Sequence, residues 1–193
     1  MIQVATPPDP WQRTVTQNGF AADEVISALQ KSLRRGLIDN ALLLGWEMFI
    51  TSPELEEKLW ARLCVISVED VGFGNPNAPV IVETLYQMHK RYPRPEGDRF
   101  LFAAHAIRLI AAGEKERTSD DMVNWAKRGT ELGELKPEII DVALDMHTRR
   151  GQEMGRDYAF FMSEASKVEP ASDKADPKYR AWILAALADG RLT

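Results

Sequence analysis

The sequence contains few of the residues from which metal and catalytic sites are usually built. Its 193 residues include three histidines (His89, His105 and His147) and one cysteine, Cys64. No histidine has a second histidine or cysteine three or four positions away, so local metal-ligand spacing is lacking. A lone cysteine excludes an intramolecular disulfide, which is typical of a reducing compartment. We expect no metal site, we expect Cys64 to be buried as a small apolar residue, and we expect His105 to be a hydrogen-bonded core or interface histidine.

Motifs for nucleotide binding are also missing from the sequence. None of the twelve glycines is followed by lysine, as a phosphate-binding P-loop requires. Gly72 and Gly74 lack the third glycine and the preceding strand of a dinucleotide site. We therefore expect no nucleotide cofactor, no ATP hydrolysis by this chain alone and a non-enzymatic role.

Long apolar segments are absent as well. The longest apolar run, residues 101–110, is interrupted by His105 and Arg108 and is too short to span a bilayer. The N-terminus lacks the basic and apolar regions of a signal peptide. A net charge of −5 argues against bulk attraction to nucleic acid or anionic membranes. A cytoplasmic protein without membrane contact is the expectation.

The sequence does carry apolar residues at helical spacing over most of its length. Their period predicts helices near 21–36, 38–50, 53–70, 77–91, 97–112, from 118 through at least 125, 137–146 and 177–187. Ser52 and Pro53 begin the third helix, Thr118 and Asp121 resemble a capping box, and Pro137 begins the seventh helix. In the second helix, the predicted inner face consists of Ile38, Ala41, Leu42, Trp46, Phe49 and Ile50. The fold class is all-α, a multi-helix bundle of antiparallel helix pairs in which the fifth helix is central.

Charged residues cluster at three places. Glu69 and Asp70 end the third helix, where they oppose the helix dipole, so a local partner should satisfy them. Basic residues end the first helix and follow the seventh, and both groups are candidate partner or phosphate contacts: Lys31, Arg34, Arg35, Arg149, Arg150 and Arg156. The first group also suits the negative end of a helix dipole without any ligand.

Two segments together resemble a known family. Residues 27–36 read SALQKSLRRG, and residues 67–78 read SVEDVGFGNPNA after an Ala-Arg pair at 61–62. Over about residues 24–112 this resembles the C-terminal helical region of the RarA/MgsA family of AAA+ ATPases, relatives of Werner-helicase-interacting proteins and clamp-loader subunits. Motif positions expected to be structural are Ser32, Glu69, Asp70, Gly72 and Pro76. Leu63 departs from the family pattern, which has a second arginine there, and no ATPase module is recognisable.

The resemblance implies a helical collar that assembles ring subunits, typically as a tetramer, in replication and recombination. The prolines near the N-terminus predict an extended arm at 1–20, the apolar period a collar-like domain at 21–156, and the weaker pattern beyond it an extension with a short final helix at 157–193. The leading hypothesis is a homo-oligomeric adaptor, a tetramer by preference, that docks onto a separate AAA+ ATPase or replication protein. The alternatives are a DNA-binding module that uses the basic residues, and an enzyme with a dispersed acid and base among Glu69, Asp70, His105 and His147.

Overall fold

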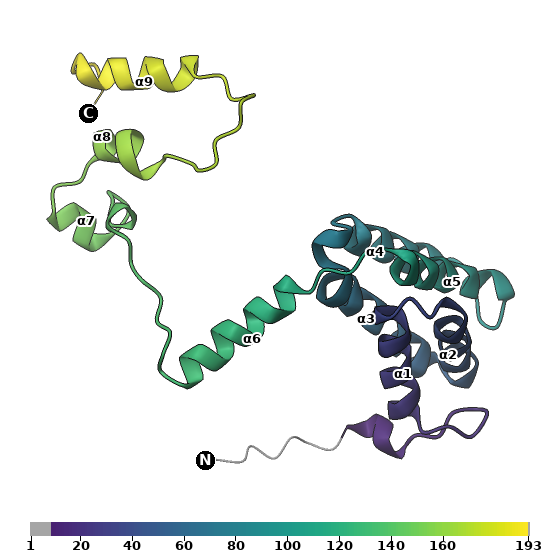
Figure 1. Cartoon of the computed structure of the whole chain (residues 1–193). Helices are drawn as coiled ribbons and strands as arrows, with labels where there is room; N and C mark the ends of the chain where they lie inside the picture. The colour runs from purple at the N-terminus through teal and green to yellow at the C-terminus, as the bar shows by residue number, and fades with distance from the viewer. Residues whose placement is uncertain (1–8, 193) are drawn as a thin grey trace. The chain divides into compact units, whose positions relative to one another are not determined.

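The computed structural model describes residues 9–192, and all the regular structure within them is helical. These residues form two compact units, one through Leu132 and one from Gly133 onward (Figure 1). The all-α prediction is confirmed. The boundary between the units lies inside the 21–156 range expected for the collar-like domain. None of the described helices is long and apolar enough to cross a lipid bilayer.

The first unit is built on five packed helices. They are α1 (Ala22–Arg34), α2 (Ile38–Thr51), α3 (Pro53–Ile66), α4 (Ala78–His89) and α5 (Gly97–Ala112). Between α3 and α4 lie a π-helical turn, η2 (Ser67–Val71), and a 3-10 turn, η3 (Gly72–Gly74). The apolar period places leucines of α1 and α3 and isoleucines of α5 in one core, among them Leu29, Leu63 and Ile110. Because α5 contacts all four of the other helices, the prediction that it is central is confirmed.

Local signals explain where several of these helices begin and end. The Ser52 hydroxyl accepts a 3.1 Å hydrogen bond from the Leu55 amide, and Pro53 occupies the first helical position, as predicted. Gly36 follows α1 with a φ of +69°, a conformation that glycine adopts without strain. The helices of the bundle therefore follow from short-range sequence signals together with one apolar face each.

The N-terminal segment begins with a short turn, η1 (Pro10–Arg13), and packs onto the bundle. Trp11 lies partly buried against the core, and Val15 forms an isolated antiparallel bridge with Ala21. The amide of Gln17 donates a 3.0 Å hydrogen bond to the Thr51 hydroxyl at the end of α2. From residue 9 onward the predicted arm is thus docked, whereas residues 1–8 lie outside the described part of the chain.

The last helix of the first unit, α6 (Thr118–Glu131), begins differently from the prediction. Thr118 is its first helical residue rather than its cap, so the predicted capping box is wrong. The Glu116 carboxylate instead accepts a 2.7 Å hydrogen bond from the Thr118 amide. A free N–H group of the first turn is thereby satisfied by an acid that precedes the helix.

The second unit contains short helices joined by turns. It comprises η4 (Asp141–Ala143), α7 (Arg149–Glu153), α8 (Tyr158–Phe160), the π-helical turn η5 (Phe161–Ala165) and α9 (Lys178–Ala188). The predicted helix over 137–146 is wrong, because only the turn η4 forms there. Ile139 and Ile140 are exposed, and a short helix without a packed apolar face is unstable in water. The final helix is confirmed, with the Asp176 carboxylate accepting a hydrogen bond from the Lys178 amide.

Candidate functional site

Large apolar side chains lie exposed along one side of α2. This helix is apolar nearly all round, and it buries Ala41, Met48 and Phe49. A side chain at Gly45 would come within 2.6 Å of Ile107, so Gly45 lets α2 approach α5 closely. Leu42 and Trp46, which were predicted to face inward, are instead 36% and 42% exposed. The helix period alone could not choose between the two apolar sides; α2 packs against α5 through Gly45, on the side that buries Ala41, Met48 and Phe49.

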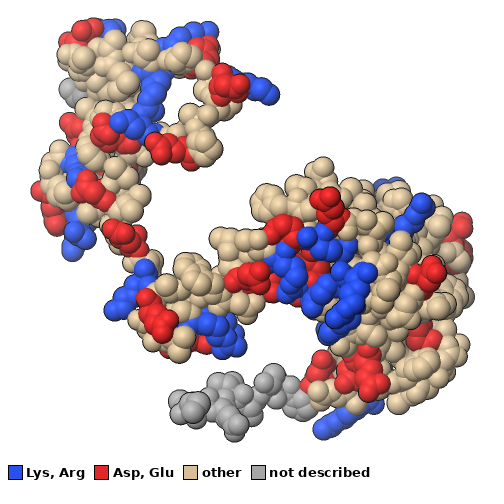
Figure 2. All heavy atoms as spheres, viewed as in Figure 1, with Lys and Arg blue, Asp and Glu red and all other residues tan. Residues whose placement is uncertain are grey.

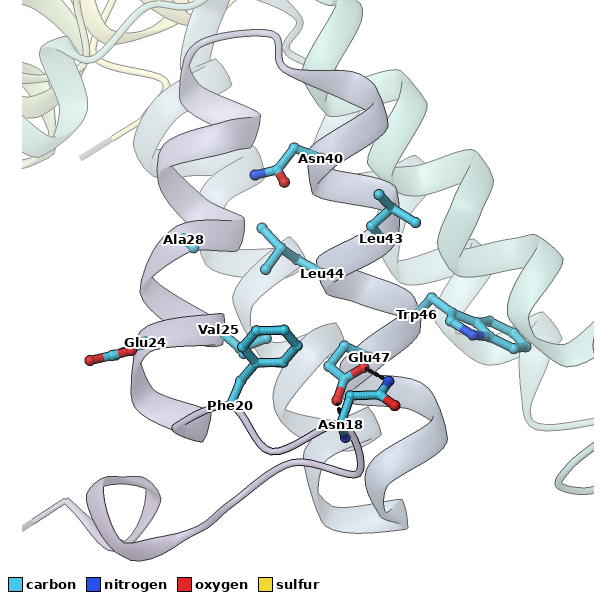
Figure 3. Close-up of a pocket in the computed structure, with 10 residues that line it drawn as sticks. All are labelled: Asn18, Phe20, Glu24, Val25, Ala28, Asn40, Leu43, Leu44, Trp46 and Glu47. Carbon is cyan, nitrogen blue, oxygen red and sulfur yellow. Dashed lines mark hydrogen bonds between the residues drawn. The ribbon is translucent and has the colours of Figure 1, made fainter.

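A groove between α1 and α2 runs beside these exposed side chains. Its lining residues are Asn18, Phe20, Glu24, Val25, Ala28, Asn40, Leu43, Leu44, Trp46 and Glu47, and we call it the α1–α2 groove. It encloses about 500 Å³. Figure 3 shows Phe20 beside Val25 and Leu44 between the two helices. Phe20 and Leu43 are 57% and 67% exposed, so apolar surface continues from the groove to its rim.

Glu47 fixes one end of the α1–α2 groove. Its carboxylate accepts hydrogen bonds from the backbone amide of Asn18, at 2.9 Å, and from the Asn18 side chain, at 2.6 Å (Figure 3). Burial raises the pKa of Glu47, but hydrogen bonds from Thr16 and Asn18 outweigh burial and leave the pKa below its ordinary value. The ionised carboxylate therefore holds the N-terminal segment in place as one wall of the groove.

The Glu69 and Asp70 pair lies at the centre of a polar cluster. The turn η2 directs Asp70 inward, where its side chain is fully buried. Arg34 Nε donates a 2.6 Å hydrogen bond to Asp70, and Arg117 donates to the same carboxylate. Glu69 lies 3.1 Å from Arg34 and 3.8 Å from Arg62. The carboxylates are satisfied locally, as expected, and three arginines from separate segments converge on them.

Figure 2 shows basic and acidic side chains gathered together on this side of the first unit. Burial alone would lower the pKa of Arg117, but its hydrogen bonds to Asp70 and Glu69 raise that pKa overall. Arg117 thus remains a cation that links η2 to the start of α6. We call Glu69, Asp70 and the arginines at 34, 62 and 117 the carboxylate cluster.

The glycines of the family-like loop allow close backbone contact next to this cluster. Gly72 has a φ of +50°, and a side chain there would lie 2.2 Å from the Glu116 carbonyl oxygen. A side chain at Gly74 would lie 2.7 Å from the Glu114 carbonyl oxygen. The amide of Glu116 in turn donates a 3.0 Å hydrogen bond to the Asp70 carbonyl. The loop therefore holds residues 114–117 against η2, while Pro76 is exposed just before α4.

Helix α6 contacts the rest of the first unit mainly at its beginning. Arg117, just before the helix, pairs with Asp70 and also with Asp120. No residue of α6 is buried. Met122 and Trp125 are 60% and 63% exposed, and Leu132 just after the helix is 71% exposed. At 100° per residue these three side chains share one face, so α6 presents an apolar stripe to solvent.

The basic residues selected from the sequence have different surroundings. Lys31 donates a 2.7 Å hydrogen bond to the Ser27 hydroxyl, and Arg35 donates to the Lys31 carbonyl. Ser32 is buried, and its hydroxyl accepts a 2.8 Å hydrogen bond from Asn40. Of this group, only Arg34 takes part in the carboxylate cluster.

The other basic group lies in the second unit. Arg149 is 3.4 Å from Glu153, and Arg150 is exposed in the same helix. Arg156 lies 2.6 Å from Asp141 and also donates to the Leu144 carbonyl. Arg156 thus ties the end of α7 to η4, which is a structural role within that unit.

A second buried charged group was not foreseen from the sequence. Glu56 is 2% exposed, and it accepts hydrogen bonds from Arg94 at 2.8 Å and from Arg99 at 2.7 Å. His89 is fully buried beside it, stacked on Trp60 with 4.7 Å between ring centroids. Burial lowers the pKa of His89, and the neighbouring Arg99 lowers it further, whereas the Tyr86 carbonyl and Glu56 raise it. Glu56 lies 38 positions before Arg94 and 43 positions before Arg99, so local spacing could not reveal this group.

The structure overturns the burial expected for Cys64 and the core placement of His105. Cys64 is exposed rather than buried, because Leu63 and Ile66 take the inner face of α3 and Cys64 lies to one side. His105 is also exposed, since Ala103, Ala106 and Ile107 face the core from α5. His105 lines a shallow cavity with Asn75 and Arg108, whereas Asp70 is enclosed by Arg34 and Arg117. His147 lies in the second unit, where it pairs with Asp145 at 3.0 Å.

Comparison with known proteins supports the resemblance seen in residues 27–36 and 67–78. Over 146 residues the chain is 30% identical to a protein from Bacillus subtilis (strain 168). This chain is similar to replication-associated recombination protein A. The match covers 75% of this chain, and it spans about a third, 34%, of the length of replication-associated recombination protein A. No family model matches the chain.

Proposed function

We propose that this chain is a non-enzymatic assembly domain of the replication-associated recombination protein A family, and that it works as a homo-oligomer. The similarity to replication-associated recombination protein A supports the family, and the sequence motifs favour its C-terminal helical collar. The central observation is the apolar surface that the first unit leaves uncovered at Phe20, Leu43 and Trp46 on the bundle and at Trp125 on α6.

Exposed apolar surface of this kind favours association. Isolated exposed leucines are ordinary, but a cluster of large apolar side chains beside a groove is typical of a protein interaction site. Covering it with a second copy removes that surface from water and produces a closed symmetric assembly. A ring of four chains would match the collar geometry that the sequence motifs imply.

The adaptor role follows from the same reasoning. A collar holds ring subunits together, and the sequence contains no P-loop with which to hydrolyse ATP. We therefore propose that the oligomer binds an AAA+ ATPase or another replication protein in the cytoplasm. Family relationship alone does not fix this role, because related folds serve different functions.

Native mass spectrometry of the full chain tests the proposal. We expect a single dominant species whose mass corresponds to two or more copies of the 21.8 kDa chain, a tetramer in the simplest case. A spectrum that contains only the 21.8 kDa monomer at micromolar concentration would contradict the proposal.

DNA binding is a second candidate, favoured by the basic side chains of the first unit. Lys31, Arg34 and Arg35 end α1, and Arg62 and Arg117 reach the same carboxylate cluster. Glu69 and Asp70 offset part of this positive charge. If the surface binds DNA, affinity for labelled duplexes should fall steeply between 50 and 200 mM salt, roughly as counterion release requires.

A further inference from the structure

The first unit carries two uncovered apolar surfaces whose shapes differ. One is concave, the α1–α2 groove of about 500 Å³. The other is convex, the stripe on α6 formed by Met122, Trp125 and Leu132, all of which are at least 60% exposed. An amphipathic helix that lays its apolar face in a hydrophobic groove is a common recognition mode. The chain therefore supplies both halves of a helix-in-groove contact.

We propose that α6 of one copy binds in the α1–α2 groove of a second copy. This inference rests on the proposed homo-oligomer and assigns the surfaces that form it. Helix α6 is fastened to its own bundle through Arg117, which pairs with Asp70 ahead of the apolar stripe. With 14 residues and a rise of about 1.5 Å per residue, it extends roughly 21 Å from that attachment.

The charges around the two surfaces are complementary. Among the groove-lining residues the charged ones are Glu24 and Glu47, both acidic. Glu47 is engaged by Asn18, whereas Glu24 is exposed at the rim. On α6, Arg128 lies beside the apolar stripe next to Trp125, and its pairing with Glu131 is an exposed one. An exposed ion pair contributes little, so Arg128 can exchange that partner for Glu24 of another copy.

Helix α9, which also has exposed aromatic residues, fits the groove less well. In α9, Tyr179 and Trp182 are exposed, but Ala186 is buried. Arg180 of α9 also donates a 3.0 Å hydrogen bond to Ser166. Part of α9 is thus already engaged within the second unit, whereas α6 buries none of its residues.

The contact also predicts the symmetry of the assembly. The groove and the helix are different surfaces, so a ring in which each α6 binds the next bundle has heterologous interfaces. A two-fold pair that exchanges both helices, which makes the same contact twice, has an isologous interface. A ring of four is the arrangement that agrees with the collar expectation.

Charge substitutions at exposed positions test the contact without disturbing the core. We expect Leu43→Glu in the groove and Trp125→Glu on α6 each to convert the oligomer to monomer in light scattering. Two matched controls should keep the wild-type mass: Lys127→Glu, on the opposite face of α6, and Val80→Glu, exposed on α4. Glu24→Arg should weaken assembly, and adding Arg128→Glu in the same chain should restore it.

Cysteine cross-linking separates contact between copies from contact within one copy. In a Cys64→Ser background, one chain carries Leu43→Cys and a second, differently tagged chain carries Trp125→Cys. Under mild oxidation the mixture should give a disulfide between the two tags, and neither chain alone should cross-link efficiently.

The outcomes distinguish this inference from the proposed function. A wild-type monomer overturns both. A wild-type oligomer that persists in Leu43→Glu and Trp125→Glu leaves the homo-oligomer intact and overturns the α6 contact. If Trp182→Glu dissociates the oligomer and Trp125→Glu does not, α9 rather than α6 binds in the groove. A third chain carries both Leu43→Cys and Trp125→Cys; a disulfide that forms within this chain, and not between the two single-cysteine chains, would place α6 on its own groove.

Discussion

At the scale of single residues, Gly72 shows how a motif position can be structural. A Cβ atom at this position would be strained by the positive φ and would overlap the Glu116 carbonyl oxygen. Gly19 has a φ of +86° but no atom within 4 Å of the place where a Cβ would lie. A side chain at Gly19 would therefore meet backbone strain alone, whereas a side chain at Gly72 would meet both strain and steric overlap.

We predict that Gly72→Ala destabilises the protein more than Gly19→Ala. Strain at positive φ should cost about 1–2 kcal/mol at either position. Overlap with Glu116 should add about 1–3 kcal/mol at position 72 only. Urea unfolding of both variants measures the difference, and equal losses of unfolding free energy would show that the loop yields to the added methyl group.

His89 is predicted to make stability depend on pH. Burial holds the pKa of His89 below its ordinary value of 6.5 in the folded state. The unfolded chain therefore binds a proton more readily, so this contribution is full above about pH 6.5 and is lost as pH falls towards the lower folded pKa. Thermal unfolding between pH 5 and 7.5 should show this slope.

A His89→Gln variant serves as the control for that experiment. It should be less stable at pH 7.5 but should lose little further stability between pH 6.5 and 5.5. An unchanged slope in the variant would assign the pH dependence to other groups. Glu47 and Asp145, whose pKa values are lowered, act at more acidic pH, because carboxylates with depressed pKa values lose their contribution only there.

At the scale of elements, the carboxylate cluster fixes three segments to one another. Asp70 is fully buried and accepts hydrogen bonds from Arg34 of α1 and from Arg117 beside α6. Removing one partner of a buried ion pair leaves the other charges without compensation. Helix α6 has few other attachments to the bundle, so it depends on this cluster for its position.

We predict that Asp70→Ala lowers the free energy of unfolding by about 3–5 kcal/mol. It should also increase amide hydrogen exchange in α6 more than in α5. Glu131→Gln, which breaks the exposed pair with Arg128, should change stability by less than about 1 kcal/mol. If the amides of α6 exchange as slowly in Asp70→Ala as in the wild type, other contacts hold the helix in place.

Short-range patterns predicted the bundle helices well and the second unit poorly. In α1, α3 and α5 the apolar period coincides with caps such as Ser52 and with a shared core, so local and tertiary preferences agree. At 137–146 the same apolar period has no core to pack on, and only a turn forms. The spacing of apolar residues does not show whether there is a core surface for a helix to pack against.

The candidate site was likewise only partly visible in the sequence. Glu69 and Asp70 stood out because acids oppose the dipole at the end of a helix. Arg117, one of their principal partners, lies 47 positions after Asp70 and carries no local signal. The exposure of Leu42 and Trp46 depends on which side of α2 meets α5, which is a tertiary choice.

At the scale of the whole molecule, the proposed assembly covers the exposed apolar surface of the first unit. Core residues such as Leu29 and Ile107 are fully buried, so the bundle is complete without a partner. The exposed side chains around the α1–α2 groove and on α6 are additional to that core. Association, rather than folding, is the process that they serve in this account.

Light scattering coupled to size exclusion, over a tenfold range of concentration and at two salt levels, tests this claim most directly. We predict a mass of two or more times 21.8 kDa, four times for the tetramer, that does not change with concentration. We also predict that high salt leaves the assembly largely intact, since apolar burial outweighs the Glu24 and Arg128 pairing. A mass of 21.8 kDa under every condition would contradict the account.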